Sequence, residues 1–169
     1  RHTRFRNVTG VQTYALPISL GRALGAALHA PFLDGDDYHT PQARERMHAG
    51  HGLTDADRAP WLARLRAELD AQGRVVLACS ALKRTYRDEL RAPGTRFLYL
   101  DVPESLLAAR LRQRRGHYAG AELLPSQLAT LEAPQPGEHD VLTLPVTPAT
   151  TPADLLARAL AALQVDRKS

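Results

Sequence analysis

The sequence predicts a single α/β domain in which a mostly parallel sheet of about five strands is covered by helices on both faces. Short apolar runs alternate with longer helical patterns along the chain, and this alternation is typical of parallel sheets with crossover helices on either side. A chain of 169 residues with 44% hydrophobic residues is long enough for one core and too short for two comfortable ones.

Each β-type run is short, apolar and followed by a turn or a helical pattern. Two of these runs are clear, at 74–79 and 95–100, and two weaker ones lie at 31–34 and 140–144. The helical patterns lie at about 20–29, 41–49, 55–72, 83–91, 103–115 and 152–164.

The helix expected from Asp55 onward begins at a sequence that resembles a capping box, Thr54-x-x-Asp57, with aspartate in place of the usual glutamate. Its apolar residues share one face at helical spacing, which predicts packing against the core. These residues are Trp61, Leu62, Leu65 and Leu69.

A net charge of +4 is compatible with a nucleic-acid binder, but a site for nucleotides and an acidic sugar would also be basic. The densest basic cluster lies at 110–115 and has no interleaved aromatic residues on which bases could stack. We therefore expect small anionic ligands, and neither a nucleic acid nor a membrane as a partner.

Cys79 is the single cysteine, so no internal disulfide can form, and a reducing cytoplasm is the expected compartment. No run approaches the ~18 apolar residues that a membrane span needs. Cys79 itself is expected to be a packed thiol.

Polar residues follow two of the predicted strands, where ligands of α/β sheets commonly bind. The turn Asp34-Gly-Asp-Asp-Tyr-His39 places three carboxylates and a histidine around a glycine. Lys83 and Arg87 follow the next strand at a spacing that puts both on one helix face, which suits an anionic ligand. The alternatives are an acidic surface turn and a solvated basic helix face.

Five strings resemble the gluconokinase family in their order and spacing. They are FLDGDDYH at 32–39, LTDADRAPWL at 53–62, CSALKRTYR at 79–87, RLRQRRGHY at 110–118 and LPSQLATLEAP at 124–134. The resemblance implies a three-layer P-loop kinase fold of the nucleoside-monophosphate-kinase type over residues 20–169, with a lid at about 110–130. It also implies MgATP-dependent phosphorylation of D-gluconate to 6-phospho-D-gluconate, and a homodimer.

The resemblance assigns candidate roles to individual residues, and none is expected to ligate a metal directly. Asp34 is expected to receive or orient the proton of the attacking hydroxyl, with Asp36 in reserve for that role or for outer-shell Mg²⁺ contact. Lys83 and Arg114 are the other catalytic candidates. The candidates for binding gluconate are Asp36, His39, Arg58, Lys83, Arg87, His117 and Gln127, and those for binding ATP are Arg110, Arg114 and Ser19.

The family pattern fails at residues 1–19, which lack the loop G-x-x-x-x-G-K-[ST] that cradles phosphates. Pro17 stands where the lysine belongs and Ile18 where the Mg²⁺-binding hydroxyl belongs, while Ser19 comes one position late. Residues 6–19 also resemble translated sequencing-adapter sequence. We expect 1–19 to be an aberrant segment that replaces strand 1 and the phosphate loop, the alternative being a genuine divergent start.

Three other functions remain open. Pro17 favours a catalytically inactive relative that still binds a sugar acid. A shikimate- or adenylate-type kinase would share the fold but should lack the acidic turn together with Cys-Ser-Ala-Leu-Lys83. A nucleic-acid binder would show steep salt dependence with oligonucleotides.

Overall fold

The computed structural model describes residues 6–10, 16–113 and 119–165. Its centre is a five-stranded sheet in the order β2-β3-β1-β4-β5, in which every neighbouring pair is parallel. The predicted α/β class is therefore confirmed. The strands are β1 (Arg6–Gly10), β2 (Phe32–Asp34), β3 (Val75–Ala78), β4 (Thr95–Asp101) and β5 (Val141–Pro145).

Helices connect the strands, as crossovers between parallel strands require. They are α1 (Leu16–Leu28), the 3₁₀ turn η1 (Gly35–Tyr38), α2 (Pro41–His48), α3 (Asp55–Ala71), α4 (Arg84–Leu90), α5 (Glu104–Gln113), α6 (Ala119–Thr130) and α7 (Pro152–Val165). In the part of the chain that is described, no helix is both long and apolar enough to cross a membrane.

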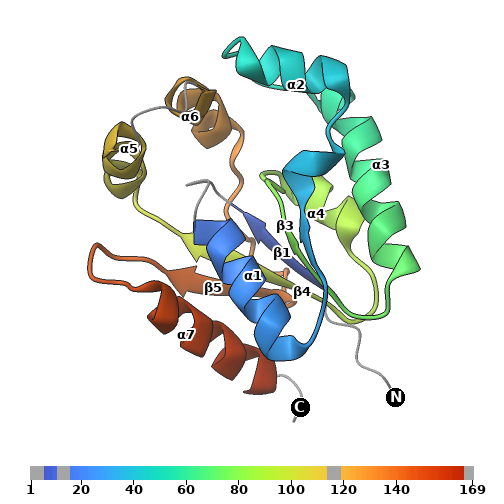
Figure 1. Cartoon of the computed structure of the whole chain (residues 1–169), viewed down its shortest axis with the longest axis vertical. Helices are drawn as coiled ribbons and strands as arrows, with labels where there is room; N and C mark the ends of the chain where they lie inside the picture. Colours follow the sequence, from blue (N-terminus) through green and yellow to red (C-terminus); the bar gives the residue numbers. More distant parts are fainter. Residues whose placement is uncertain (1–5, 11–15, 114–118, 166–169) are drawn as a thin grey trace.

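Helices cover both faces of the sheet, so the chain forms three layers (Figure 1). A hydrophobic cluster lies between the sheet and the helices on each face. On one face, α1 and α7 pack against Val76 and Leu98, and on the other, α3 and α4 pack against Val75 and Leu77. Successive residues of β3 thus point to opposite faces, and all four are buried because both faces are covered.

The start of α3 confirms the predicted capping box. The backbone N–H of Asp57 donates to Thr54 Oγ1 at 3.1 Å, and the N–H of Thr54 donates to Asp57 Oδ2 at 2.9 Å. The four apolar residues predicted to line the core face of this helix, Trp61, Leu62, Leu65 and Leu69, are all buried.

The centre of the sheet is a strand that the sequence did not predict. β1 pairs with β3 on one side and β4 on the other, with Val8 opposite Leu77 and Phe97. Its sequence, RNVTG, contains one aliphatic residue, whereas central parallel strands are usually continuous apolar runs. Hydrophobic pattern therefore gave no indication of a strand here.

The predicted lid at 110–130 comprises the end of α5, residues 114–118, which lie outside the described residues, and α6. Its closing over phosphates stays a prediction.

Candidate active site

The carboxyl ends of β2 and β3 meet at one edge of the sheet. Asp34 ends β2 and lies in register with Ala78, which ends β3. Because all strands run the same way, the residues that follow each strand gather at this edge, as the sequence predicted.

The acidic turn after β2 is held tightly against the end of β3. A Cβ at Gly35 would lie 2.6 Å from Cys79 Cβ and 2.9 Å from the Ala78 carbonyl oxygen, so only glycine fits at this position. Asp34 caps η1, because its Oδ1 accepts the backbone N–H of Asp36 at 3.0 Å. This contact keeps the Asp34 carboxylate close to the backbone of the turn.

Asp36 is a carboxylate of this turn with a shifted pKa. Burial raises its pKa to about 6, and the neighbouring carboxylates of Asp34 and Asp37 act in the same direction. Asp36 therefore titrates close to neutral pH, within the range useful for proton transfer.

His39 follows the turn and is 3% exposed. Its ring stacks on Trp61 with centroids 4.6 Å apart and planes 10° from parallel, and its Nε2 lies 3.8 Å from Asp36 Oδ1. Burial, assisted by the positive charges of Arg58 and Arg44, lowers the pKa of His39 to about 4, so the imidazole is neutral at pH 7. Its Nδ1 is buried without a hydrogen-bond partner among the described residues.

Arg58 on α3 is a buried cation with unused donors. It is 6% exposed, and neither its Nε nor its Nη1 has a hydrogen-bond partner among the described residues. Its Cζ lies 5.7 Å from the Trp61 ring centroid and 5.4 Å from that of Tyr86, and burial lowers its pKa. Burying guanidinium donors unpaired is costly, and an anionic ligand would remove that cost by accepting from them.

Lys83 precedes α4 and faces the same tyrosine. Its Nζ donates to Asp55 at 2.8 and 3.0 Å and lies 5.6 Å from the Tyr86 ring centroid. The Tyr86 hydroxyl also donates to Asp55. Two cations, Lys83 and Arg58, therefore lie against one aromatic ring, and the positive charge of Lys83 is held by a carboxylate that is itself exposed.

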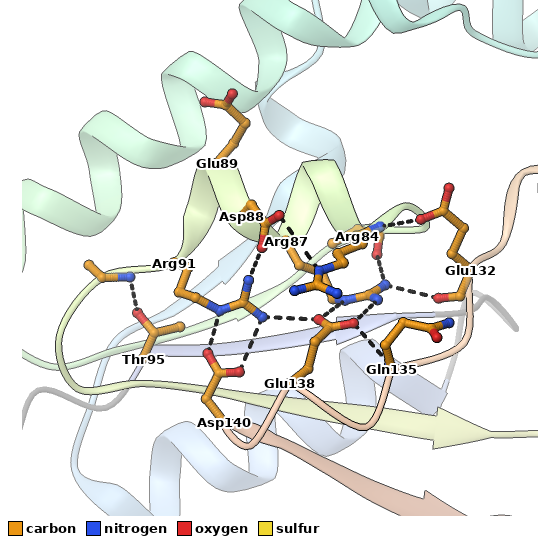
Figure 2. Close-up of polar contacts among 12 residues, drawn as sticks. Arg84, Arg87, Asp88, Glu89, Arg91, Thr95, Glu132, Gln135, Glu138 and Asp140 are labelled. Carbon is orange, nitrogen blue, oxygen red and sulfur yellow. Dashed lines mark hydrogen bonds and ion pairs between the residues drawn. The ribbon is translucent and has the colours of Figure 1, made fainter.

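Arg87 is engaged within the protein. Its Nε and Nη2 donate to the two carboxylate oxygens of Glu138 at 2.8 and 2.6 Å, and its Nη1 donates to the Glu132 carbonyl at 3.0 Å (Figure 2). The predicted pairing of Lys83 and Arg87 on one ligand-facing surface is thus not what the contacts show, because each cation is paired with a different carboxylate. Hydrogen bonding from Arg87 lowers the pKa of Glu138 to about 2.

The other predicted site residues lie further along the chain. Ser19 is exposed on α1, Gln127 is half-buried on α6, and Arg110 belongs to α5. Arg114 and His117 lie outside the described residues.

Sequence reasoning missed three residues of this site. Asp55 and Tyr86 hold Lys83, and Trp61 was interpreted as core packing alone. All three belong to the strings 53–62 and 79–87, so their clustering beside charged residues was the available indication.

Comparison with solved structures identifies the class of protein. Shikimate kinase from Aquifex aeolicus superimposes with a TM-score of 0.56 at 13% identity, covering 98% of this chain and 99% of that one. A likeness at this identity concerns the fold alone, which is that of P-loop kinases. No family model matches the sequence.

Closer relatives define the family. A gluconokinase structure from Sinorhizobium meliloti 1021 superimposes with a TM-score of 0.85 at 41% identity, covering 97% of this chain and 93% of that one. The gluconokinase of Gluconobacter oxydans is 46% identical over 138 residues, which cover 78% of this chain and 76% of the relative. The thermosensitive gluconokinase of Escherichia coli is 38% identical over 135 residues, 75% of this chain and 71% of the relative. The chain belongs to the gluconokinase family.

Proposed function

We propose that this chain binds D-gluconate at the carboxyl ends of β2 and β3, and that the site is built to present the 6-hydroxyl for phosphorylation. The observation that carries the proposal is Arg58, a buried guanidinium whose Nε and Nη1 have no partner among the described residues. A sugar acid supplies the carboxylate that these donors lack, together with hydroxyls for the neighbouring polar groups.

The contacts support a division of roles within the site. Arg58 and Lys83 lie against the Tyr86 ring, and in our proposal they bind the carboxylate. Neutral His39, whose Nδ1 has no partner in the described part of the chain, suits a hydroxyl better than a charged group. In our proposal Asp34 accepts or orients the proton of the reacting hydroxyl, with Asp36 in reserve.

We assign Arg87 a structural role in place of the substrate-binding role expected from the sequence. The Arg87 side chain is 5% exposed, and its guanidinium donates to Glu138 and to backbone carbonyls. Moving it onto a ligand would take two charged hydrogen bonds from the buried Glu138 carboxylate and leave it with Arg91 and the Gln135 N–H, which is unfavourable. Gln127, His117, Arg110 and Arg114 remain candidates for contacts made by the lid.

The start of α1 does not fit MgATP as P-loop kinases bind it. Pro17 is buried in the first turn and offers neither a positive charge nor an N–H donor, and Ile18 offers no hydroxyl for Mg²⁺. Ser19 is exposed on the helix, one position later. Since losing one preorganised donor typically slows a reaction by about 10²–10³, we propose that the chain as it stands does not phosphorylate gluconate measurably.

We further propose that residues 1–19 replace a native strand and phosphate loop. The composition of β1 supports this, because a central strand of a parallel sheet is expected to be mostly apolar and RNVTG is not. The five strings that resemble the gluconokinase family, by contrast, all lie between residues 32 and 134.

The test is a coupled assay for 6-phosphogluconate on three proteins. The first is the unmodified chain, the second has 11–19 replaced by a Gly-rich loop ending in Lys-Ser-Thr, and the third has 1–19 replaced by an apolar strand plus that loop. We expect no activity in the first and restored activity in the third, with the second showing whether β1 suffices as a strand. Robust activity of the unmodified chain would refute the claim of a missing loop. Inactivity of a folded, ATP-binding third protein would refute the assignment to gluconate.

Pro17 also favours a second candidate, a catalytically inactive sugar-acid-binding protein. Calorimetry of the unmodified chain with D-gluconate, shikimate and ATP separates the possibilities. Gluconate binding alone, with no activity after loop repair, supports the inactive relative, whereas preference for shikimate supports the other kinase class. The cytoplasmic location and the homodimer stay predictions.

A further inference from the structure

We infer that Trp61 is a positioning residue of the gluconate site and that its indole reports occupancy of that site. The inference rests on the function proposed above and adds a residue that the spacing of apolar positions on α3 places simply in the core. Trp61 is 0% exposed, so its contacts with the site are made by groups hidden from solvent.

The first contact fixes the acidic turn. Trp61 Nε1 donates to the Gly35 carbonyl at 2.7 Å across 26 residues of sequence. On its other side, Gly35 approaches Cys79 and Ala78 so closely that a Cβ does not fit. Gly35 is therefore held from two directions, and the carboxylates of Asp34 and Asp36, which flank it, are positioned with it.

The other contacts are made by the ring itself. His39 stacks on the indole at 4.6 Å, and the Arg58 guanidinium carbon lies 5.7 Å from the ring centroid. The Trp61 ring thus contacts both His39 and Arg58, whose Nδ1, Nε and Nη1 atoms have no hydrogen-bond partner among the described residues. Phenylalanine would keep an aromatic ring at this position but would leave the Gly35 carbonyl without its donor.

The same contacts make the indole a sensor. The sequence contains a single tryptophan, so the indole emission has one origin. When a carboxylate pairs with Arg58, the positive charge beside the indole is neutralised and its local field changes. Binding of D-gluconate should therefore change the emission of Trp61, even in a chain that cannot transfer phosphate.

The test compares three proteins by calorimetry and fluorescence with D-gluconate as the probe. Trp61→Phe keeps an aromatic ring and removes the N–H donor, and Leu65→Ala is the matched control, since Leu65 is equally buried one turn further along α3. We expect Trp61→Phe to raise the calorimetric Kd about tenfold, the effect of one lost hydrogen bond of ordinary strength. We expect Leu65→Ala to lower stability without changing that Kd more than twofold.

Emission of the unmodified chain should change along the calorimetric binding curve, and this measurement does not depend on any variant folding. A Kd for Trp61→Phe within twofold of the unmodified chain would overturn the positioning role. Unchanged emission at calorimetric saturation would overturn the sensor. Both results leave gluconate binding intact and so spare the proposed function, whereas absence of gluconate binding by the unmodified chain overturns the proposed function and this inference together.

Discussion

Arg87 and Glu138 are 51 residues apart in the sequence and form a buried two-pronged ion pair, with nitrogen-to-oxygen distances of 2.8 and 2.6 Å. Arg91, the residue directly after α4, donates to Glu138 at 3.0 Å and to Asp140 at 2.6 Å. The segment that returns from α6 to β5 is thereby fastened to α4 (Figure 2). The same segment reaches the start of α4, where Glu132 Oε2 accepts the backbone N–H of Arg84 at 2.8 Å.

Replacing Glu138 should therefore destabilise the fold substantially. Glu138→Ala leaves the Arg87 guanidinium buried without its partner, so we expect a loss of about 3–5 kcal/mol in the free energy of unfolding, measured by urea denaturation. Asp70→Asn is the control, because it alters an exposed i,i+4 pair with Arg66 and should cost less than about 1 kcal/mol. Equal small effects would show that the Arg87–Glu138 pair contributes no more than a surface pair.

The Arg87–Glu138 pair also predicts how the free energy of unfolding changes at acid pH. The folded pKa of Glu138 is about 2, below its ordinary value of 4.5, so its contribution is complete above pH 4.5 and is lost as pH falls towards 2. Unfolding measured between pH 6 and pH 2.5 should therefore show a shallower decline in Glu138→Gln than in the unmodified chain. Parallel declines would contradict the assignment.

Asp34→Asn in the loop-repaired protein should lower kcat by more than tenfold while gluconate still binds. Asparagine can still accept the Asp36 N–H through its Oδ1, so the turn is kept and only the proton acceptor is lost. Steady-state kinetics with calorimetry of gluconate binding measure the two effects separately. A kcat within twofold would make Asp34 a turn residue and move the proton-accepting role to Asp36.

Lys83→Ala should weaken the use of gluconate in the repaired protein by about 1.5–3 kcal/mol in kcat/KM, the range for a hydrogen bond to a charged group. The control is Arg84→Ala, the exposed neighbour whose guanidinium lies 3.9 Å from Asp88. Circular dichroism checks that both variants fold. Equal kcat/KM in the two variants would mean that Lys83 serves Asp55 and not the substrate.

Asp36 predicts how gluconate affinity depends on pH. Its pKa of about 6 means that its negative charge disappears as pH falls below that value, whereas His39, with a pKa of about 4, stays neutral. An anion beside Asp36 binds better once this charge is removed, so the affinity measured by calorimetry should rise from pH 7.5 to pH 5.5. Asp36→Asn should bind with little dependence on pH over this range, and an unchanged slope in that variant would place the ligand elsewhere.

The alternation of strands and helices was readable from the sequence because most segments carry their own pattern. β3 and β4 are apolar runs, and the start of α3 at Thr54 has a local hydrogen-bonding signature. β1 could not be predicted, because its position between β3 and β4 depends on backbone pairing, and the sequence RNVTG carries no strand pattern. A strand or helix can be predicted from sequence where its residue preferences agree with its burial. A strand whose position depends on backbone pairing alone cannot.

The site shows the same division. The turn from Asp34 to His39 could be placed because polar residues directly follow a strand, and strand ends of a parallel sheet share an edge. The fate of Arg87 could not be foreseen, because its partner Glu138 lies in a Pro/Gly-rich loop far along the chain. The polar contacts of Trp61 could not be foreseen either, because helical spacing predicts only that the residue is buried. It does not distinguish a purely apolar core residue from one that also donates a hydrogen bond.

The position of β1 also has a consequence for how the molecule is made. β1 precedes both of its neighbours in the chain, and the far end of β4 is Asp101. At translation speeds of about 5–20 residues per second, the ribosome needs roughly 5–20 s to make the stretch from the end of β1 to the end of β4. The nascent β1 therefore waits for seconds with both hydrogen-bonding edges unpaired, and the sheet must assemble around a strand that was synthesised before both of its neighbours.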